Sequence, residues 1–202
     1  MIRLTLIACF ISSVCFSQTN ELYTLAFKKK ENFKILSAFN QRIPETFEVI
    51  NTTEKWNPQT FFLKDLDLRN PKVIDSLKYE EHHPYLFAYL FSNPKLDALI
   101  PDAEKERLSK RASQIKPSKI AFKGNGFQLV ERFNKPLGFY FLIASPVYST
   151  DNRYAFLKIS VKEKRVFLDE KMDDYYAILT IMFEKDLNGK WKQIGIKDHL
   201  IL

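Results

Sequence analysis

From Ser118 onward, runs of apolar and aromatic residues alternate with short turn sequences, and this pattern constrains the fold more than any other feature. Glycine and asparagine accept positive φ and proline presets φ, so such residues mark tight turns. The turns are Gly124-Asn125-Gly126, Asn134-Lys135-Pro136, Thr150-Asp151-Asn152 and Asn188-Gly189. The strands expected between them are Lys119–Phe122, Phe127–Phe133, Phe139–Tyr148, Tyr154–Lys162, Tyr175–Glu184 and Lys190–Ile196. We therefore predict an antiparallel β-meander.

One of these strands is apolar at nearly every position, from Tyr175 to Phe183. A strand of this kind is covered on both faces, so it is expected near the centre of the sheet with helices packed on at least one side. Pro146 lacks a backbone N–H, so it should mark an edge or a bulge.

The N-terminal half carries helical rather than strand periodicity at its start. Apolar residues recur at helical spacing and predict a helix over Glu21–Asn40, ended by Ile43-Pro44. Two strands are predicted after it, over Thr46–Thr53 and Thr60–Leu68.

The segment from Lys72 to Lys116 lacks strand alternation and contains several prolines, which predicts short helices. The clearest follows Pro101, with Asp102 expected as the N-cap and Pro117 as the stop. Its apolar face would be Leu108, Ala112 and Ile115. With no internal repeat and no long linker, the chain is predicted to be one α+β domain over residues 18–202, its N-terminal helix and short central helices packed on the C-terminal meander.

Residues 1–17 have the organisation of a secretory signal peptide. Met1-Ile2-Arg3 is positively charged, Leu4 to Phe16 is almost wholly apolar, and small residues precede the expected cleavage site after Ser17. A membrane anchor is the alternative, but the apolar run is shorter than the roughly 20 residues of a spanning helix. A second alternative is lipidation at Cys9, because Leu6-Ile7-Ala8-Cys9 is similar to the lipobox of bacterial lipoproteins.

Cleavage after Ser17 would remove both cysteines, Cys9 and Cys15. The exported domain would then contain no disulfide and depend on its hydrophobic core. It would also lack cysteine nucleophiles and cysteine metal ligands.

Glycine is scarce in the chain, with 5 glycines against 18 phenylalanines. Glycine-rich phosphate loops are therefore disfavoured. Gly124-x-Gly126 lacks the third glycine and the following helix of a dinucleotide site, so it is interpreted as a turn. No G-x-S-x-G nucleophile elbow is present.

Two polar segments are candidates for chemistry. The Glu80–His83 segment could form a loop metal site for zinc or copper, or it could be a solvated turn before Pro84. The Asp173/Asp174 pair could supply an acid and a base, although carboxylates beside turns are usually solvated. Asp65-x-Asp67 and Asp198-His199 are weaker pairs of the same kind. None of these patterns assigns a catalytic, cofactor-binding or metal-binding residue.

The formal charge of +7 indicates a basic protein. Its basic clusters are Lys28-Lys29-Lys30 with Lys34; Lys105, Arg107, Lys110, Arg111 and Lys116; and Lys162, Lys164 and Arg165. They could hold the protein near an anionic polymer or membrane surface, or be an ordinary hydrated surface. Nucleic acid is disfavoured as a partner, because no recognisable nucleic-acid-binding module is present.

Two C-terminal stretches carry a resemblance to known proteins: Ser145-Pro146-Val147-Tyr148-Ser149-x-Asp151-x-x-Tyr154-Ala155, and Phe183-x-Lys185 followed by Asn188-Gly189-Lys190-Trp191-Lys192. They resemble a loosely defined group of secreted proteins of Gram-negative bacteria. The resemblance covers the last third of the chain and implies secretion and a β-meander, with no catalytic residue to carry over. The order of elements is also similar to the nuclear-transport-factor-like cone, although two strands intervene between the first and later helices.

These observations favour an exported, non-catalytic module that binds an envelope protein, a polymer or a small ligand. The alternative is an envelope hydrolase or loop metal-binding protein that uses the Glu80–His83 segment or the Asp173/Asp174 pair. A deep pocket of converging polar side chains would favour the hydrolase, and a flat polar surface around an aromatic patch would favour the binding module.

Overall fold

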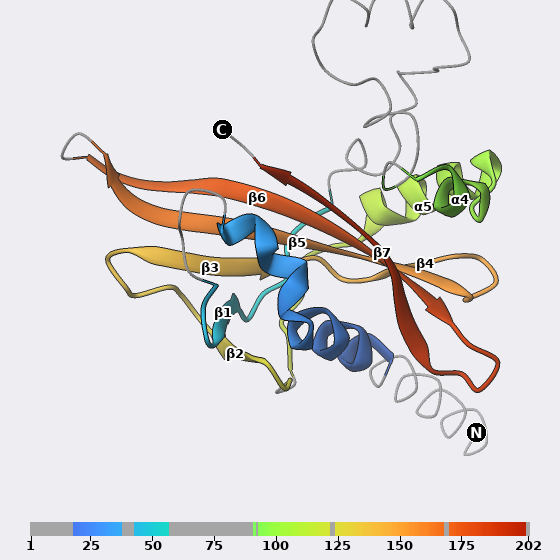
Figure 1. The fold of residues 1–202 in the computed structure, drawn as a ribbon, viewed down its shortest axis with the longest axis horizontal. Coiled ribbons are helices and arrows are strands. Elements are labelled where there is room, and N and C mark those ends of the chain that lie inside the picture. Colours follow the sequence, from blue (N-terminus) through green and yellow to red (C-terminus); the bar gives the residue numbers. More distant parts are fainter. Residues whose placement is uncertain are drawn as a thin grey trace, which may run out of the picture.

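The structure, a computed structural model, describes residues 18–37, 43–56, 91, 93–121, 124–167 and 170–200. The predicted strand Thr60–Leu68 and the Glu80–His83 segment lie outside these residues. Helices gather toward the N-terminal half and strands toward the C-terminal half, which confirms the α+β class (Figure 1).

Seven strands of the described residues form one sheet in the order β2-β1-β3-β5-β6-β7, with β4 paired to β5. Their bounds are β1 Phe47–Ile50, β2 Phe127–Val130, β3 Gly138–Ile143, β4 Val147–Tyr148, β5 Tyr154–Phe167, β6 Glu170–Lys185 and β7 Trp191–Leu200. The strands expected over Thr46–Thr53, Phe127–Phe133, Tyr154–Lys162, Tyr175–Glu184 and Lys190–Ile196 therefore exist, and Phe139–Tyr148 is divided into β3 and β4, with Pro146 in the link between them. Of the strand expected at Lys119–Phe122, the described residues 119–121 form none, since Lys119 makes only an isolated bridge to Thr52, and Phe122 lies outside the described residues.

The predicted C-terminal antiparallel meander is confirmed for β3, β5, β6 and β7, although the sheet as a whole is mixed. Strands β3, β5, β6 and β7 are successive antiparallel neighbours, as expected. Strand β1, however, lies between β2 and β3 and runs parallel to both. Alternation of apolar residues indicates which face a side chain occupies but not the direction of the neighbouring strand, so the sequence pattern did not reveal this crossover.

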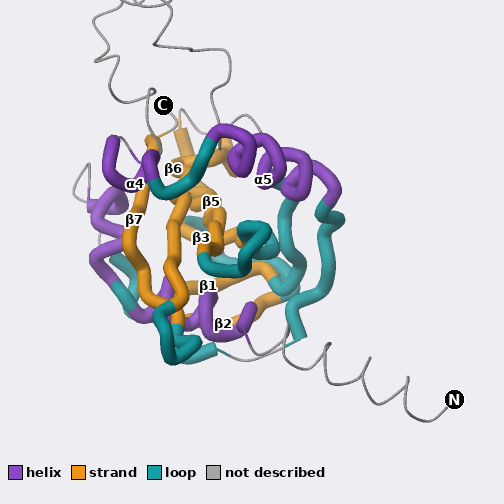
Figure 2. The backbone as a smooth tube through the Cα atoms, turned by 90° about the vertical axis from the view of Figure 1, so that its right-hand side faces the viewer, coloured by secondary structure: helices purple, strands orange, loops and turns teal. Residues whose placement is uncertain are grey.

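The sheet is covered on both faces, as the apolar strand Tyr175–Phe183 indicated. Side chains Leu157 of β5 and Leu179 of β6 belong to a core under the N-terminal helix, whereas Phe156 and Met182 belong to a second core on the opposite face. Figure 2 shows the strands enclosed between α4 (Pro94–Ala98) and α5 (Asp102–Gln114) on one side and the N-terminal helical segment on the other.

The predicted helix Glu21–Asn40 is broken into two pieces, which corrects that expectation. Residues 18–28 form an α-helix, and a 3-10 segment, η1, follows over Lys30–Ser37. Side chains six residues apart would lie on different sides of a continuous helix. The break instead lets Phe27 stack on Phe33, with ring centroids 5.4 Å apart, and Asn32 Nδ2 donates to the buried carbonyl of Ala26 at 2.9 Å.

Helix α5 begins one residue earlier than expected. Pro101 is the N-cap and Asp102 the first helical residue, where its carboxylate still lies near the positive end of the helix dipole. Leu108 and Ala112 are buried as predicted, and the helix ends at Gln114, before Pro117. In the described part of the chain, no helix combines the length and the apolar character needed to cross a bilayer.

Candidate functional site

A buried polar network lies on the α4 and α5 side of the sheet. The Glu54 carboxylate accepts a hydrogen bond from Ser160 Oγ at 2.5 Å and lies 3.2 Å from Lys158 Nζ. Lys158 is 5% exposed and Ser160 is fully buried. The network fixes the segment after β1 to strand β5 through Ser160 and Lys158. The Glu54 backbone N–H also fixes it to β3, by donating to Ile143 O at 2.8 Å.

The protonation of Glu54 is set by opposing effects. Burial raises the pKa of the carboxyl, while the Lys158 ammonium and the hydrogen bond from Ser160 lower it, and the net shift is upward. A carboxylate with a raised pKa beside a serine hydroxyl has the residue types of a base-activated nucleophile. Because Ser160 has no exposed surface, a substrate cannot reach its oxygen in this conformation, and the network is structural here.

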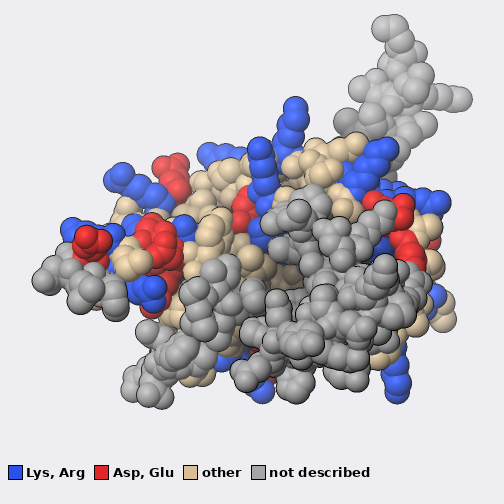
Figure 3. Space-filling view, turned by 90° about the horizontal axis from the view of Figure 1, so that it is seen from above, with Lys and Arg blue, Asp and Glu red and all other residues tan. Residues whose placement is uncertain are grey.

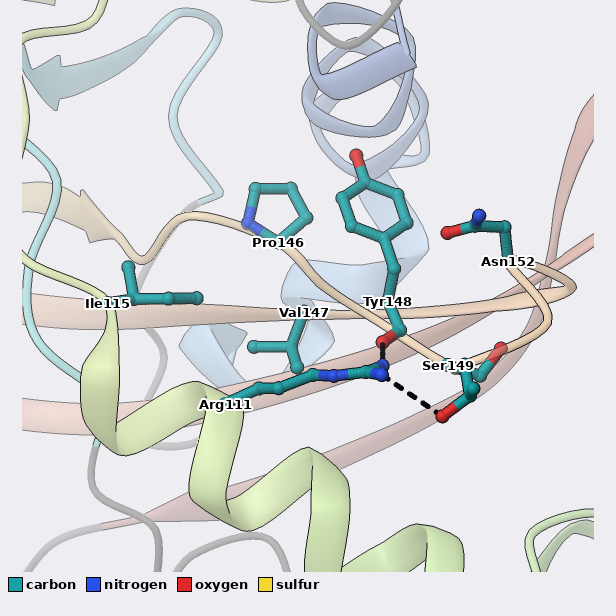
Figure 4. Close-up of a pocket in the computed structure, with 8 residues that line it drawn as sticks. Arg111, Ile115, Pro146, Val147, Tyr148, Ser149 and Asn152 are labelled. Atoms are coloured by element: carbon teal, nitrogen blue, oxygen red, sulfur yellow. Dashed lines mark hydrogen bonds between the residues drawn. The ribbon is translucent and has the colours of Figure 1, made fainter.

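A groove of about 400 Å³ lies along the outer edge of β4, next to the end of α5. Its apolar lining residues are Ile115, Pro146, Val147 and Tyr148, and its polar ones are Arg111, Ser149, Thr150 and Asn152. Figure 4 shows the Val147 side chain on the same side of the strand as Arg111 and Ile115, with the Tyr148 ring directed toward the N-terminal helix. Its hydroxyl contacts Thr19 Oγ1 of that helix at 3.3 Å.

Two side chains of α5 hold the β4–β5 turn in place. Arg111 Nη1 donates to Tyr148 O at 2.7 Å, and Nη2 donates to Thr150 Oγ1 at 3.0 Å (Figure 4). Glu104 Oε1 accepts from the Thr150 backbone N–H at 2.7 Å. Burial acts to raise the pKa of Glu104, but the hydrogen bonds from Thr150 and Arg107 lower it overall. Glu104 is therefore ionised in the neutral range, and its hydrogen bond to Thr150 holds the β4–β5 turn at the polar end of the groove.

The turn itself explains the sequence motif around Ser149. Its hydroxyl donates to Asp151 Oδ1 at 2.5 Å and accepts from the Tyr154 backbone N–H at 2.9 Å. Asn152 adopts the left-handed region, with φ of 55°, which asparagine tolerates well. The hydrogen bond from Ser149 and that from the Arg153 backbone lower the pKa of Asp151. All of these hydrogen bonds join residues within the β4–β5 hairpin to one another.

The structure does not bring the Asp173/Asp174 pair together. The two residues are consecutive in β6, so their side chains point to opposite faces. Asp173 Oδ1 accepts from Tyr140 Oη at 2.6 Å and lies 3.6 Å from Lys162 Nζ. The described residues contain no group of three or more His, Cys, Asp or Glu side chains arranged to hold a metal ion.

The basic clusters of α5 and β5 are largely paired with acidic groups. Lys105 lies 2.8 Å from Asp97, and Arg107 lies 3.2 Å from Glu104. Arg165 contacts Glu163 at 3.5 Å. Figure 3 shows the molecule from above. On the described part of that face, acidic and basic side chains are interspersed and do not form one continuous basic patch.

Sequence reasoning missed Glu54 and Lys158 and treated Arg111 only as part of a basic cluster. Lys158 carried a signal, because it lies in an otherwise apolar strand between Leu157 and Ile159, where a buried charge needs a partner. The partner was not identifiable, since Glu54 is distant in the sequence. The hairpin residues Ser145–Ala155 were noted, but the groove beside them depends on where α5 packs.

No protein-family model, curated protein or solved structure matches the chain.

Proposed function

We propose that this chain is an exported, non-catalytic binding module whose ligand site is the groove between α5 and β4, called here the α5–β4 groove. The observation that carries the proposal is the composition of its lining: an apolar wall and a guanidinium group held in a fixed position. Ligand sites typically combine a mostly apolar surface with a few placed polar groups, in a volume of roughly 300–1,000 Å³.

The groove is better suited to a compact ligand than to an added β-strand. Pro146 has no backbone N–H, and the Tyr148 carbonyl already accepts a hydrogen bond from Arg111. The edge of β4 therefore lacks the regular donors and acceptors that strand addition uses. Recognition would rely on side chains, chiefly Ile115, Val147 and the polar residues of the turn.

Export is compatible with the described contacts of the first helix. Thr19 contacts Tyr148, and the Glu21 carboxylate accepts from the Trp191 backbone N–H at 3.3 Å. Both residues follow the expected cleavage site, so cleavage before Gln18 would retain these two contacts.

We expect the exported protein to begin at Gln18 and to carry no lipid. Intact mass spectrometry of protein recovered from a Gram-negative expression host would establish both points. A diacylglyceryl group on Cys9 would instead make the protein a lipoprotein and the membrane a partner, and an uncleaved chain would contradict export by this leader.

The binding proposal is tested with a neutral probe, benzyl alcohol, by NMR of the ¹⁵N-labelled mature chain. We expect shift changes centred on the backbone amides of residues 111, 115 and 147–152. The variant Ile115→Asn should weaken binding, because it places an amide in the apolar wall. The control Leu187→Asn changes a fully exposed leucine at the β6–β7 turn and should leave binding unchanged. No shift changes in the groove, or changes spread over the surface, would contradict the proposal.

A further inference from the structure

Resting on the proposed function, we infer that the α5–β4 groove takes a small monoanion, a carboxylate attached to a compact apolar group. Arg111 would bind the carboxylate and the Ile115–Val147 wall the apolar part. Three features carry this inference: the donors that Arg111 keeps, the charge of the lining and the placement of the apolar wall.

The guanidinium is fixed but not saturated. A guanidinium has five N–H groups in a planar fork. One on Nη1 and one on Nη2 donate to the β4–β5 turn, at 2.7 and 3.0 Å, and the others have no acceptor in the described part of the chain. The Arg111 side chain is also 41% exposed, so these donors are accessible. A fixed fork with open N–H groups matches the two oxygens of a carboxylate.

The lining favours an anion. Arg111 is the only charged residue among the eight that line the groove. The Glu104 carboxylate lies 3.8 Å from Arg111 Nη1 but is already engaged by Thr150 and by Arg107 at 3.2 Å. Asp151, a second carboxylate beside the lining, is likewise engaged, by Ser149 Oγ at 2.5 Å and by the Arg153 backbone N–H at 3.0 Å. What the polar end of the groove offers an anion is therefore the open donors of Arg111, not an excess of positive charge.

The apolar wall adjoins the guanidinium. Arg111 and Ile115 are one helical turn apart, and the Val147 side chain lies on the same side of β4 (Figure 4). A ligand that places its carboxylate on Arg111 would therefore lay a short apolar group chiefly against Ile115, because Val147, although it lines the groove, is only 2% exposed. The single guanidinium of Arg111 matches one carboxylate. The short apolar wall matches one ring or a short alkyl chain.

The test compares phenylacetate with phenylacetamide, which has the same shape without the charge, on the mature wild-type chain. Binding is measured by NMR titration of the groove amides and of the Arg111 Nε–Hε signal. We expect the dissociation constant of phenylacetate to be at least about tenfold lower, as a charge-assisted hydrogen bond would produce. Equal affinities would overturn the monoanion inference while leaving the groove as a binding site, and failure of both probes to bind would overturn both proposals.

Variants assign the preference to Arg111. Arg111→Met should abolish the preference for phenylacetate over phenylacetamide, and Arg111→Lys should retain only part of it, because lysine keeps the charge but lacks the fork. The control Arg165→Met removes an arginine of similar exposure on β5, away from the groove, and should keep the full preference. A preference that persists in a folded Arg111→Met protein would overturn the assignment. If that variant does not fold, a wild-type titration that shifts the Arg111 Nε–Hε signal decides for the inference, and one that leaves it unmoved decides against it.

Discussion

Replacing Lys158 with methionine is expected to lower the free energy of unfolding by about 3–5 kcal/mol near neutral pH. The substitution keeps the length of the side chain but removes the ammonium that faces Glu54 at 3.2 Å. The carboxylate would then be buried without a counter-charge, which costs far more than the net stabilisation from the original pair. Chemical denaturation of the wild type and the variant measures the difference.

The loss of unfolding free energy caused by Lys158→Met should become smaller as the pH falls. Burial raises the pKa of Glu54 even though the Lys158 ammonium acts to lower it. In Lys158→Met that lowering effect is lost, so the pKa of Glu54 should rise further. A carboxyl with a raised folded-state pKa binds a proton that the unfolded chain releases, so its contribution to stability grows below that pKa and is lost above it. Unfolding measured at about pH 7 and about pH 5 should therefore show a smaller deficit at the lower pH.

The double variant Glu54→Gln/Lys158→Met is the matched control. Glutamine keeps an amide oxygen as an acceptor for the fully buried Ser160 hydroxyl while removing the charge. The double variant should be more stable than Lys158→Met alone, and its difference from the wild type should depend less on pH. A Lys158→Met loss within about 0.5 kcal/mol would show that the pair is solvated rather than buried.

Trp191→Ala is expected to cost about 3–5 kcal/mol of unfolding free energy. The indole is 4% exposed in the core under the N-terminal helix. Its ring centroid lies 5.9 Å from that of Tyr148, and Lys185 Nζ lies 4.6 Å from it. Removing the ring would leave a cavity between the helix and β7, visible as a lower thermal midpoint and an earlier denaturation transition.

The two buried tryptophans provide an internal comparison. Trp191 Nε1 has no hydrogen-bond partner among the described residues, whereas Trp56 Nε1 donates to Ser145 O at 2.7 Å. Trp191→Phe should therefore cost less than Trp56→Phe, which additionally breaks a hydrogen bond worth about 0.5–1.5 kcal/mol. A Trp191→Ala loss below about 1 kcal/mol would place the ring in solvent and make it a candidate ligand contact.

The sequence predicted features that depend on neighbours along the chain. The apolar run Tyr175–Phe183 indicated a strand buried on both faces, and β6 is one, with β5 and β7 on either side. The turns Thr150-Asp151-Asn152 and Asn188-Gly189 lie where expected, and Gly189 has the positive φ that favours glycine there. Local hydrogen bonding and backbone preference are sufficient for such features.

Features that depend on distant segments could not be predicted in the same way. The position of β1 between β2 and β3 depends on how the segment between β1 and β2 crosses the sheet, which no local pattern records. The pairing of Glu54 with Lys158 depends on the same connection between β1 and β2. The α5–β4 groove also depends on it, because α5 is part of that connection. Arg111 was recognisable as one cation among several, but its role beside β4 follows only from the packing of α5.

The place of β1 also sets an order in which the chain can acquire its structure. Strands β5 and β6 pair across the short connection between Phe167 and Glu170, and β6 and β7 pair across the turn between Lys185 and Trp191. Contacts so close in sequence form quickly, because little chain entropy is lost in closing them. The helix over residues 18–28 and strand β1 instead contact residues between Phe127 and Trp191, which a ribosome makes much later than the helix and β1 themselves. The first elements of the domain thus wait for their partners during synthesis, and closing these long-range contacts costs more chain entropy than closing the hairpins.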